Sequence, residues 1–220
     1  MGHMITLPRQ DGGSLDAYVS GSNPTLPGVI VIQEYWGLND HIKSIVDRFA
    51  AEGFNAIAPD LYHGRITQDP DEASHMMNGM DFKGAVHEDI AAAQTFLAAI
   101  NPKVAVMGFC MGGALTIASA ARLPGFAAAV CFYGIPPKEF ARAADIRIPF
   151  QGHFGSEDHW VSPAVVEDIK TSMEAAGQHP EIYSYEADHA FFNNTRPTVY
   201  NPEAAEAAWN RMIPFLKQHL

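Results

Sequence analysis

The strongest structural signal in the chain is the stretch Val106-Met107-Gly108-Phe109-Cys110-Met111-Gly112-Gly113. A short β-branched strand is predicted just before it, over 103–107, and the segment that opens at Gly113 has the composition of a helix. This order matches a nucleophile elbow, G-x-nucleophile-x-G, with cysteine where serine usually stands. The Cys110 sulfur would lie at a helix N-terminus, where free N–H groups and the dipole favour a thiolate. The alternative is a buried cysteine in an ordinary strand–helix turn.

Length and charge limit the classes of protein to which the chain can belong. The 220 residues suit one α/β domain with a sizeable core. The formal net charge of −11 argues against binding to nucleic acid or to an anionic membrane surface, because both would repel the chain. The apolar runs have the length of strands, so no transmembrane helix is expected. We expect a cytoplasmic enzyme.

The N-terminus lacks the basic region and apolar core of a signal peptide. Residues 1–3 resemble a cloning remnant, and Met4 opens a strand-like Ile-Thr-Leu. No repeat, low-complexity tract or linker interrupts the remainder, so residues 4–220 are predicted to form a single domain. The two cysteines, Cys110 and Cys131, are expected to be free thiols, with Cys131 in the core.

Short apolar runs alternate with segments of helical spacing along the chain. Strands are predicted at 28–33, 54–59, 103–107, 126–133, 148–153 and 181–185. Helices are predicted at 40–51, at 86–100, from 113 onward, from 162 to 177 and at 202–220. The polar segment 62–80, which contains Gly64, Pro70 and Gly79, is expected to cover the top of the sheet. This alternation predicts a mainly parallel central sheet with helices on both faces.

Four reactive side chains follow predicted strands: Glu34, Cys110, Asp158 and His189. The carboxyl ends of parallel strands meet at one edge of a sheet, so we expect all four residues there. The order nucleophile, acid, histidine is that of the α/β-hydrolase fold. A thiol needs a base to hold it as a thiolate, and the base needs an acid that fixes its tautomer and steadies its charge. Cys110, His189 and Asp158 can supply these three roles.

Each of these assignments has an ordinary alternative. His189 is one of ten histidines, and a lone histidine is more often a surface or core residue. Asp158 has the setting of a turn carboxylate, and Glu157 and Asp188 are rival acids. Asp188 is disfavoured because a side chain adjacent in sequence to His189 normally points away from it.

Glu34 lies in Gln33-Glu-Tyr-Trp-Gly37. It is either a solvated loop carboxylate or, if the two aromatic residues after it cover it, a partly desolvated one that can take up a thiol proton. His153 and His159 near the predicted acid lack the spacing of a metal site. We therefore expect neither a metal nor a cofactor.

Several short motifs occur together along the chain: Gln33-Glu34 with Trp36-Gly37 and Asn39, Ala58-Pro-Asp-Leu-Tyr62, Gly108 to Gly113, Phe132-Tyr-Gly134, Gly155 with Asp158, and His189 with Phe191. In this combination the chain resembles the dienelactone hydrolase family, the carboxymethylenebutenolidases. The resemblance extends over nearly the whole sequence from about Met4.

The resemblance implies a set of roles for these residues. It implies that Cys110, His189 and Asp158 are catalytic, and that Glu34 accepts the thiol proton once substrate arrives. It also implies an oxyanion hole formed by the backbone N–H groups of Tyr35 and Met111, which are expected to face the tetrahedral oxyanion. Such a contact typically contributes about 3–4 kcal/mol to the transition state.

The chain departs from the family pattern at the residues that hold the substrate carboxylate. The family uses two arginines for this purpose. One belongs four residues after the catalytic histidine, where this chain has Asn193, and the other belongs in the segment after Tyr62, near Met76. Arg65 or Arg196 could substitute from shifted positions. The hydrolytic residues match the family, whereas the carboxylate anchors do not.

We therefore predict a cofactor-independent hydrolase of small esters or lactones that acts through an acyl-cysteine intermediate. Trp36, Tyr133, Phe191 and Asn193 are expected to line its pocket, although core packing explains the aromatic residues equally well. The alternatives are a noncatalytic binding protein with the same fold and a redox-sensing thiol protein. The expected partner is a small-molecule ester or lactone, and the sequence predicts no oligomeric state.

Overall fold

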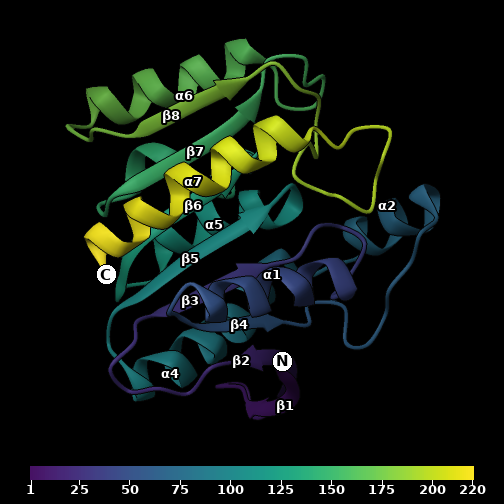
Figure 1. Cartoon of the computed structure of the whole chain (residues 1–220), viewed down its shortest axis with the longest axis vertical. Helices are drawn as coiled ribbons and strands as arrows, with labels where there is room; N and C mark the ends of the chain where they lie inside the picture. The colour runs from purple at the N-terminus through teal and green to yellow at the C-terminus, as the bar shows by residue number, and fades with distance from the viewer.

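The computed structural model describes residues 1–220 and contains one sheet of eight strands, in the order β1-β2-β4-β3-β5-β6-β7-β8 (Figure 1). The strands from β4 to β8 in this order pair in parallel, and β2 is antiparallel to both of its neighbours. The predicted α/β-hydrolase fold with a mainly parallel sheet is confirmed. The strands are β1 (His3–Pro8), β2 (Ser14–Ser20), β3 (Gly28–Ile32), β4 (Asn55–Pro59), β5 (Val104–Phe109), β6 (Phe126–Phe132), β7 (Phe150–Gly155) and β8 (Glu181–Tyr185).

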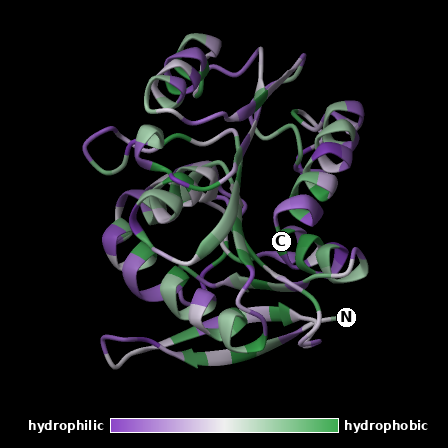
Figure 2. Ribbon diagram, turned by 90° about the vertical axis from the view of Figure 1, so that its left-hand side faces the viewer, coloured by the Kyte–Doolittle hydropathy of each residue, from purple (hydrophilic) through white to green (hydrophobic).

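Helices cover both faces of this sheet, as predicted. The helices α1 (Asp40–Ala51) and α7 (Pro202–His219) pack on one face, and α4 (Ala91–Ile100), α5 (Met111–Arg122) and α6 (Pro163–Ala175) pack on the other. Figure 2 shows hydrophilic and hydrophobic residues on the same helices, which is the amphipathic pattern of helices between a sheet and solvent. None of the helices combines the length and the apolar character that spanning a bilayer requires.

The sheet divides the core into two parts because side chains alternate along each strand. Ile30 and Ile32 of β3 belong to a cluster of 35 buried residues on one face, and Val29 and Val31 belong to a cluster of 30 on the other. The strands β3, β4 and β5 are buried along their whole length. The centre of the sheet is therefore a rigid platform for the loops at its carboxyl edge.

The polar segment 62–80 contains a helix, α2 (Pro70–Asn78), which was not among the predicted helices. Asp69 caps this helix by accepting a hydrogen bond from the backbone N–H of Glu72 at 2.8 Å. Proline occupies its first helical position, where the missing N–H is not needed. The cap and the first-turn proline favour a helix in this segment, although it shows little apolar periodicity.

The predicted helix at 86–100 is not one regular α-helix. It is preceded by one turn, α3 (Phe82–Gly84), and its first part is a π-helical segment, η1 (Ala85–Ile90). Only α4 continues it as a regular helix. A single 3₁₀ turn, η2 (Ala143–Asp145), completes the list of elements.

Candidate active site

Cys110 lies in the sharp turn between β5 and α5. Its φ of 55° is in the left-handed region, which is strained for a residue with a side chain. The Cys110 N–H donates to the Phe132 carbonyl, and the Cys110 carbonyl accepts from the Ala114 N–H, both at 3.0 Å. The thiol is half-buried and stands at the N-terminus of α5. These bonds hold the reactive atom in place at the carboxyl edge of the sheet.

Glycine is required on both sides of Cys110 because the backbone passes too close for any side chain. A Cβ at Gly108 would lie 2.4 Å from the carbonyl oxygen of Gly112, and a Cβ at Gly112 would lie 2.4 Å from the carbonyl oxygen of Ile32. Both contacts are with backbone, which cannot rotate aside. The spacing of the glycines in the sequence therefore follows from the convergence of β3, β5 and α5 at one point.

His189 and Asp158 form a hydrogen-bonded pair beside this turn. The Nδ1 atom of His189 lies 2.7 Å from Oδ2 of Asp158. The other carboxylate oxygen accepts hydrogen bonds from the N–H groups of Trp160 at 2.7 Å and Val161 at 2.9 Å. Although burial opposes it, the bonds to His189 and to the backbone hold the pKa of Asp158 below its usual value. Asp158 is therefore a fixed carboxylate, oriented by its own loop.

The two rival acids form no hydrogen bond with the imidazole of His189. Asp188 instead accepts a hydrogen bond from the backbone N–H of His189 at 2.6 Å. Glu157 is exposed to solvent. The side chain that orients the His189 ring is accordingly that of Asp158.

The side chains of His189 and Cys110 line the same cavity. Burial lowers the pKa of His189, but the hydrogen bond to Asp158 and the nearby Cys110 sulfur raise it to about 10. The ring also meets Tyr133 edge to face, with centroids 5.1 Å apart. A histidine that holds its proton this tightly can stabilise a thiolate at Cys110 once one forms.

Glu34 is 2% exposed, so it is not a solvated loop carboxylate. Its Oε1 accepts a hydrogen bond from the Tyr133 hydroxyl at 3.3 Å, and its Oε2 accepts one from the Asn193 side-chain amide. Burial raises the pKa of Glu34 above its usual value, although these two donors and the nearby His189 act in the opposite direction. No hydrogen bond joins Glu34 to Cys110. The carboxylate is thus held beside the thiol but not on it.

A cavity of about 160 Å³ contains the Cys110 thiol. A larger cavity of about 630 Å³ adjoins it, and the two share Trp36 and Arg196. The Arg196 guanidinium lies 4.5 Å from the centre of the Trp36 ring and forms no ion pair with an acidic side chain. Trp160, at the mouth, is 83% exposed. The smaller cavity is lined by Glu34, Tyr35, Trp36, Cys110, Trp160, Asp188, His189, Ala190, Arg196 and Val199.

Only one of the four residues predicted to line the pocket does so in the structure. Trp36 lines both cavities, whereas Tyr133, Phe191 and Asn193 are completely buried and line neither. Tyr133 and Asn193 donate hydrogen bonds to Glu34 instead, a role that no sequence pattern indicates. Arg65 lies at a different cavity, where it is 3.9 Å from Glu72.

Two backbone N–H groups beside Cys110 are free to receive an anion. The N–H of Tyr35 donates no hydrogen bond within the protein. Met111 is the first residue of α5, where an N–H has no partner inside the helix. These are the two donors that the family resemblance implies.

His153 is completely buried, with both ring nitrogens engaged. Nδ1 lies 2.8 Å from the Tyr185 hydroxyl, and Nε2 lies 2.8 Å from the side-chain carbonyl of Gln151. It therefore has no free nitrogen with which to bind a metal ion.

Comparisons with known proteins give a consistent result. The model of the dienelactone hydrolase family matches residues 15–220. "Protein usf" from Aquifex pyrophilus is 36% identical over 234 residues, and a protein from Aquifex aeolicus provisionally assigned as a carboxymethylenebutenolidase is 32% identical over 231 residues. Both alignments cover 100% of each chain. The crystal structure of a provisionally assigned dienelactone hydrolase from Klebsiella pneumoniae superposes with a TM-score of 0.89 at 29% identity, covering 99% of this chain and 98% of that chain.

Proposed function

Because the chain belongs to the dienelactone hydrolase family and is a hydrolase of ester-type substrates, we propose that it cleaves small esters or lactones through a Cys110–His189–Asp158 triad. The observation that carries this proposal is the 2.7 Å bond between His189 Nδ1 and Asp158 Oδ2. That bond fixes the tautomer and leaves the other ring nitrogen for the Cys110 sulfur.

In the first half of the reaction, the thiolate of Cys110 attacks the carbonyl carbon of the ester. The carbonyl π electrons move to oxygen and form a tetrahedral oxyanion. When this collapses, the bond to the alkoxy oxygen breaks and His189 donates its proton to that oxygen. An ester gives a free alcohol and an acyl-cysteine. A lactone gives a single product, an acyl-cysteine whose acyl group carries the new hydroxyl.

In the second half, neutral His189 removes a proton from a water molecule, and the resulting hydroxide attacks the acyl-cysteine. The second oxyanion collapses by breaking the carbon–sulfur bond. The carboxylic acid leaves, and the thiolate is restored beside a protonated His189. Asp158 remains ionised throughout and stabilises the imidazolium.

Both tetrahedral oxyanions need donors that are in place before the reaction begins. The free N–H groups of Tyr35 and Met111 support this role, because each lies next to a residue of the site and neither is used by the fold.

For Glu34 we propose the role of a proton acceptor for the resting thiol. Its raised pKa and its place in the cavity of Cys110 support this, because a carboxylate that holds its proton more tightly than usual can accept one from sulfur. The bonds from Asn193 and Tyr133 mean that the carboxylate must rotate to reach the thiol, so substrate binding is the step expected to move it.

The test is a panel of p-nitrophenyl esters and small lactones assayed with the wild type and with Cys110→Ala. We expect loss of turnover by about 10³-fold or more without loss of the fold, and a wild-type acyl adduct on Cys110 in acid-quenched mass spectra. Cys131→Ala is the matched control, because this thiol is completely buried and burial raises its pKa to about 12. Its activity should stay within a few fold of wild type.

Two other outcomes would redirect the assignment. Saturable binding of the esters without turnover in the wild type would identify a noncatalytic binding protein. Fast oxidation of Cys110 by peroxide, again without ester turnover, would identify a redox-sensing thiol.

A further inference from the structure

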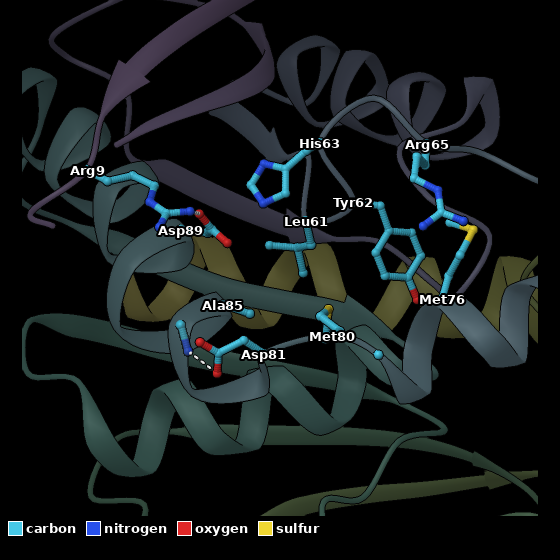
Figure 3. Close-up of a pocket in the computed structure, with 12 residues that line it drawn as sticks. Arg9, Leu61, Tyr62, His63, Arg65, Met76, Met80, Asp81, Ala85 and Asp89 are labelled. Atoms are coloured by element: carbon cyan, nitrogen blue, oxygen red, sulfur yellow. Dashed lines mark hydrogen bonds and ion pairs between the residues drawn. The ribbon is translucent and has the colours of Figure 1, made fainter. Parts of the chain in front are cut away.

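A second cavity, of about 460 Å³, shares no lining residue with the cavity of Cys110. It lies between the loop after β1, the turn after β4, helix α2 and the π-helical segment η1 (Figure 3). Its walls are formed by Arg9, Leu61, Tyr62, His63, Arg65, Met76, Gly79, Met80, Asp81, Gly84, Ala85 and Asp89. Nothing in the proposed hydrolase mechanism uses it.

Asp89 is the unusual member of this cavity. Only 4% of the residue is exposed, and its Oδ1 accepts a hydrogen bond from Nη1 of Arg9 at 3.0 Å. Its Oδ2 accepts no hydrogen bond from the protein. Figure 3 shows the carboxylate beside the Arg9 guanidinium, at one end of the cavity. Because Asp89 lines the cavity and its Oδ2 is not sealed from solvent, this oxygen can accept a hydrogen bond from a donor bound there.

The charges around Asp89 determine whether a ligand that donates to it should be a cation or an anion. Arg9 is shared between Asp89 and Asp11, whose carboxylate accepts from Nε of Arg9 at 3.1 Å. The carboxylate of Glu88 in turn accepts from the backbone N–H of Asp11 at 3.0 Å. Asp11 and Asp89 thus share one guanidinium, and Glu88 adds a third carboxylate beside Asp11, so a further anion would be repelled. His63 and Asp81 also line this side of the cavity, and Arg65 lies at the far end, 3.9 Å from Glu72, so the Asp89 end favours a cation.

The rest of the cavity is suited to a short apolar group. Leu61, Met76, Met80 and Ala85 contribute hydrocarbon and thioether surface to its walls. Figure 3 shows Leu61 and Met80 between Asp89 at one end and Met76 at the other. Methionine side chains adapt to the shape of a bound group more readily than branched ones do.

The backbone around this cavity is also unusual. Asp89 is carried by η1, and π-helical turns are rare and are found frequently at functional sites. Four residues other than glycine have positive φ: Cys110, Tyr133 and Ala190 at or beside the candidate active site, and His63, which lines this second cavity at φ 51°. Strain of this kind is tolerated where a position serves a function.

We propose that this cavity is a second, noncatalytic binding site for an organic cation, in which a primary ammonium group donates to Oδ2 of Asp89 and a short apolar chain lies along Met76 and Met80. The site goes beyond the proposed hydrolase function and does not depend on it. Its ligand class is a small primary amine rather than a carboxylate or an alcohol.

The test is isothermal titration calorimetry with n-hexylamine, and with n-hexanoate and 1-hexanol as probes of the same length. We expect the wild type to bind one n-hexylamine and neither of the other probes. Asp89→Asn keeps the shape of the side chain but removes the charge, and should weaken n-hexylamine binding by about tenfold or more. Asp71→Asn removes the same charge from an exposed position on α2 outside the cavity and should leave binding unchanged.

A second variant keeps the proposal testable if Asp89→Asn does not fold. Met80→Trp retains Asp89 and fills the cavity, so n-hexylamine should no longer bind. Retained binding in this variant or in a folded Asp89→Asn protein would overturn the proposal. Equal binding of n-hexanoate and n-hexylamine by the wild type would also overturn it, because the site would then not select a cation.

Discussion

Glu34 is held by hydrogen bonds from residues far away in the sequence, and these bonds keep its carboxylate off the Cys110 thiol. Asn193 is 159 positions away and Tyr133 is 99 positions away, and each donates to one carboxylate oxygen. Asn193 is itself fixed, because its side-chain carbonyl accepts from both the N–H and the hydroxyl of Thr195. The resting carboxylate is therefore a nearby negative charge rather than a direct partner of the thiol.

Replacing Glu34 tests two effects of its carboxylate: acceptance of the thiol proton during turnover and opposition to a thiolate at rest. Glu34→Gln preserves the shape but removes the charge and the proton acceptor. We expect ester turnover to fall by about 10²-fold. Resting alkylation of Cys110 by iodoacetamide should become faster, because no negative charge then opposes the thiolate. Glu157→Gln, an exposed carboxylate on a neighbouring loop, should change neither rate. Wild-type turnover and alkylation in Glu34→Gln would show that Glu34 takes no part in the reaction.

Arg196 provides a second prediction at this scale. With Asn193 in place of one family arginine, the sequence alone favours no advantage for anionic substrates. The structure places the Arg196 guanidinium, free of acidic partners, at the wall between the two adjoining cavities. We therefore expect Arg196→Gln to lower kcat/KM for a carboxylate-bearing ester by about tenfold or more, and to leave a neutral ester of equal size nearly unchanged.

The matched control is Arg65→Gln, since Arg65 lies at a different cavity. If Arg196→Gln lowers kcat/KM equally for both esters, the arginine supports the pocket through its stacking on Trp36 rather than through its charge. If only Arg65→Gln affects the anionic ester, the anchor has been assigned to the wrong residue.

At the scale of elements, the sequence predicted those parts whose periodicity and end signals agree. The buried strands and α1 are of this kind, and Asn39 caps α1 by accepting from the N–H of Ile42 at 3.2 Å. Helix α2 was missed because it has few apolar positions, and its cap and first-turn proline were the only signals. The π-helical η1 could not be predicted, because its spacing differs from that of an α-helix by one residue in a turn.

The elbow gives a prediction about an element junction. Gly112→Ala would place a Cβ 2.4 Å from the Ile32 carbonyl oxygen, so β3 and α5 would have to separate. We expect a loss of about 1–3 kcal/mol in the free energy of unfolding, measured by urea denaturation, together with loss of turnover. Gly79→Ala is the control, because a Cβ there would meet nothing closer than 3.4 Å. Equal stability of the two variants would contradict the close approach at the elbow.

At the scale of the whole molecule, the convergence of Cys110, Asp158 and His189 was predictable and their environment was not. Cys110, Asp158 and His189 each follow a strand of a parallel sheet, so topology alone brings them to one edge. The donors to Glu34 and the polar network around His153 depend on which side chains meet in the assembled core. His153 lies between Tyr185 and Gln151, and Gln151 in turn donates to Glu181 at 2.8 Å.

This buried network makes the stability of the fold depend on pH. Burial lowers the pKa of His153 to about 3, whereas an unfolded chain has a histidine pKa of about 6.5. Between these values the unfolded chain binds a proton that the folded chain does not bind, so stability is complete above about pH 6.5 and is lost as the pH falls. His41, with its pKa lowered to about 4 by burial, acts in the same direction.

We therefore expect His153 alone to remove roughly 2–3 kcal/mol from the free energy of unfolding between pH 7.5 and pH 4.5. Urea denaturation at several pH values measures this loss, and His153→Gln should make it smaller by that amount even if the variant is less stable at every pH. His179→Gln, at an exposed histidine, should keep the wild-type dependence. An unchanged dependence in His153→Gln would mean that the folded protein protonates His153 as easily as the unfolded chain does, and that the acid sensitivity arises from carboxylates such as Asp158, whose pKa is lowered in the fold.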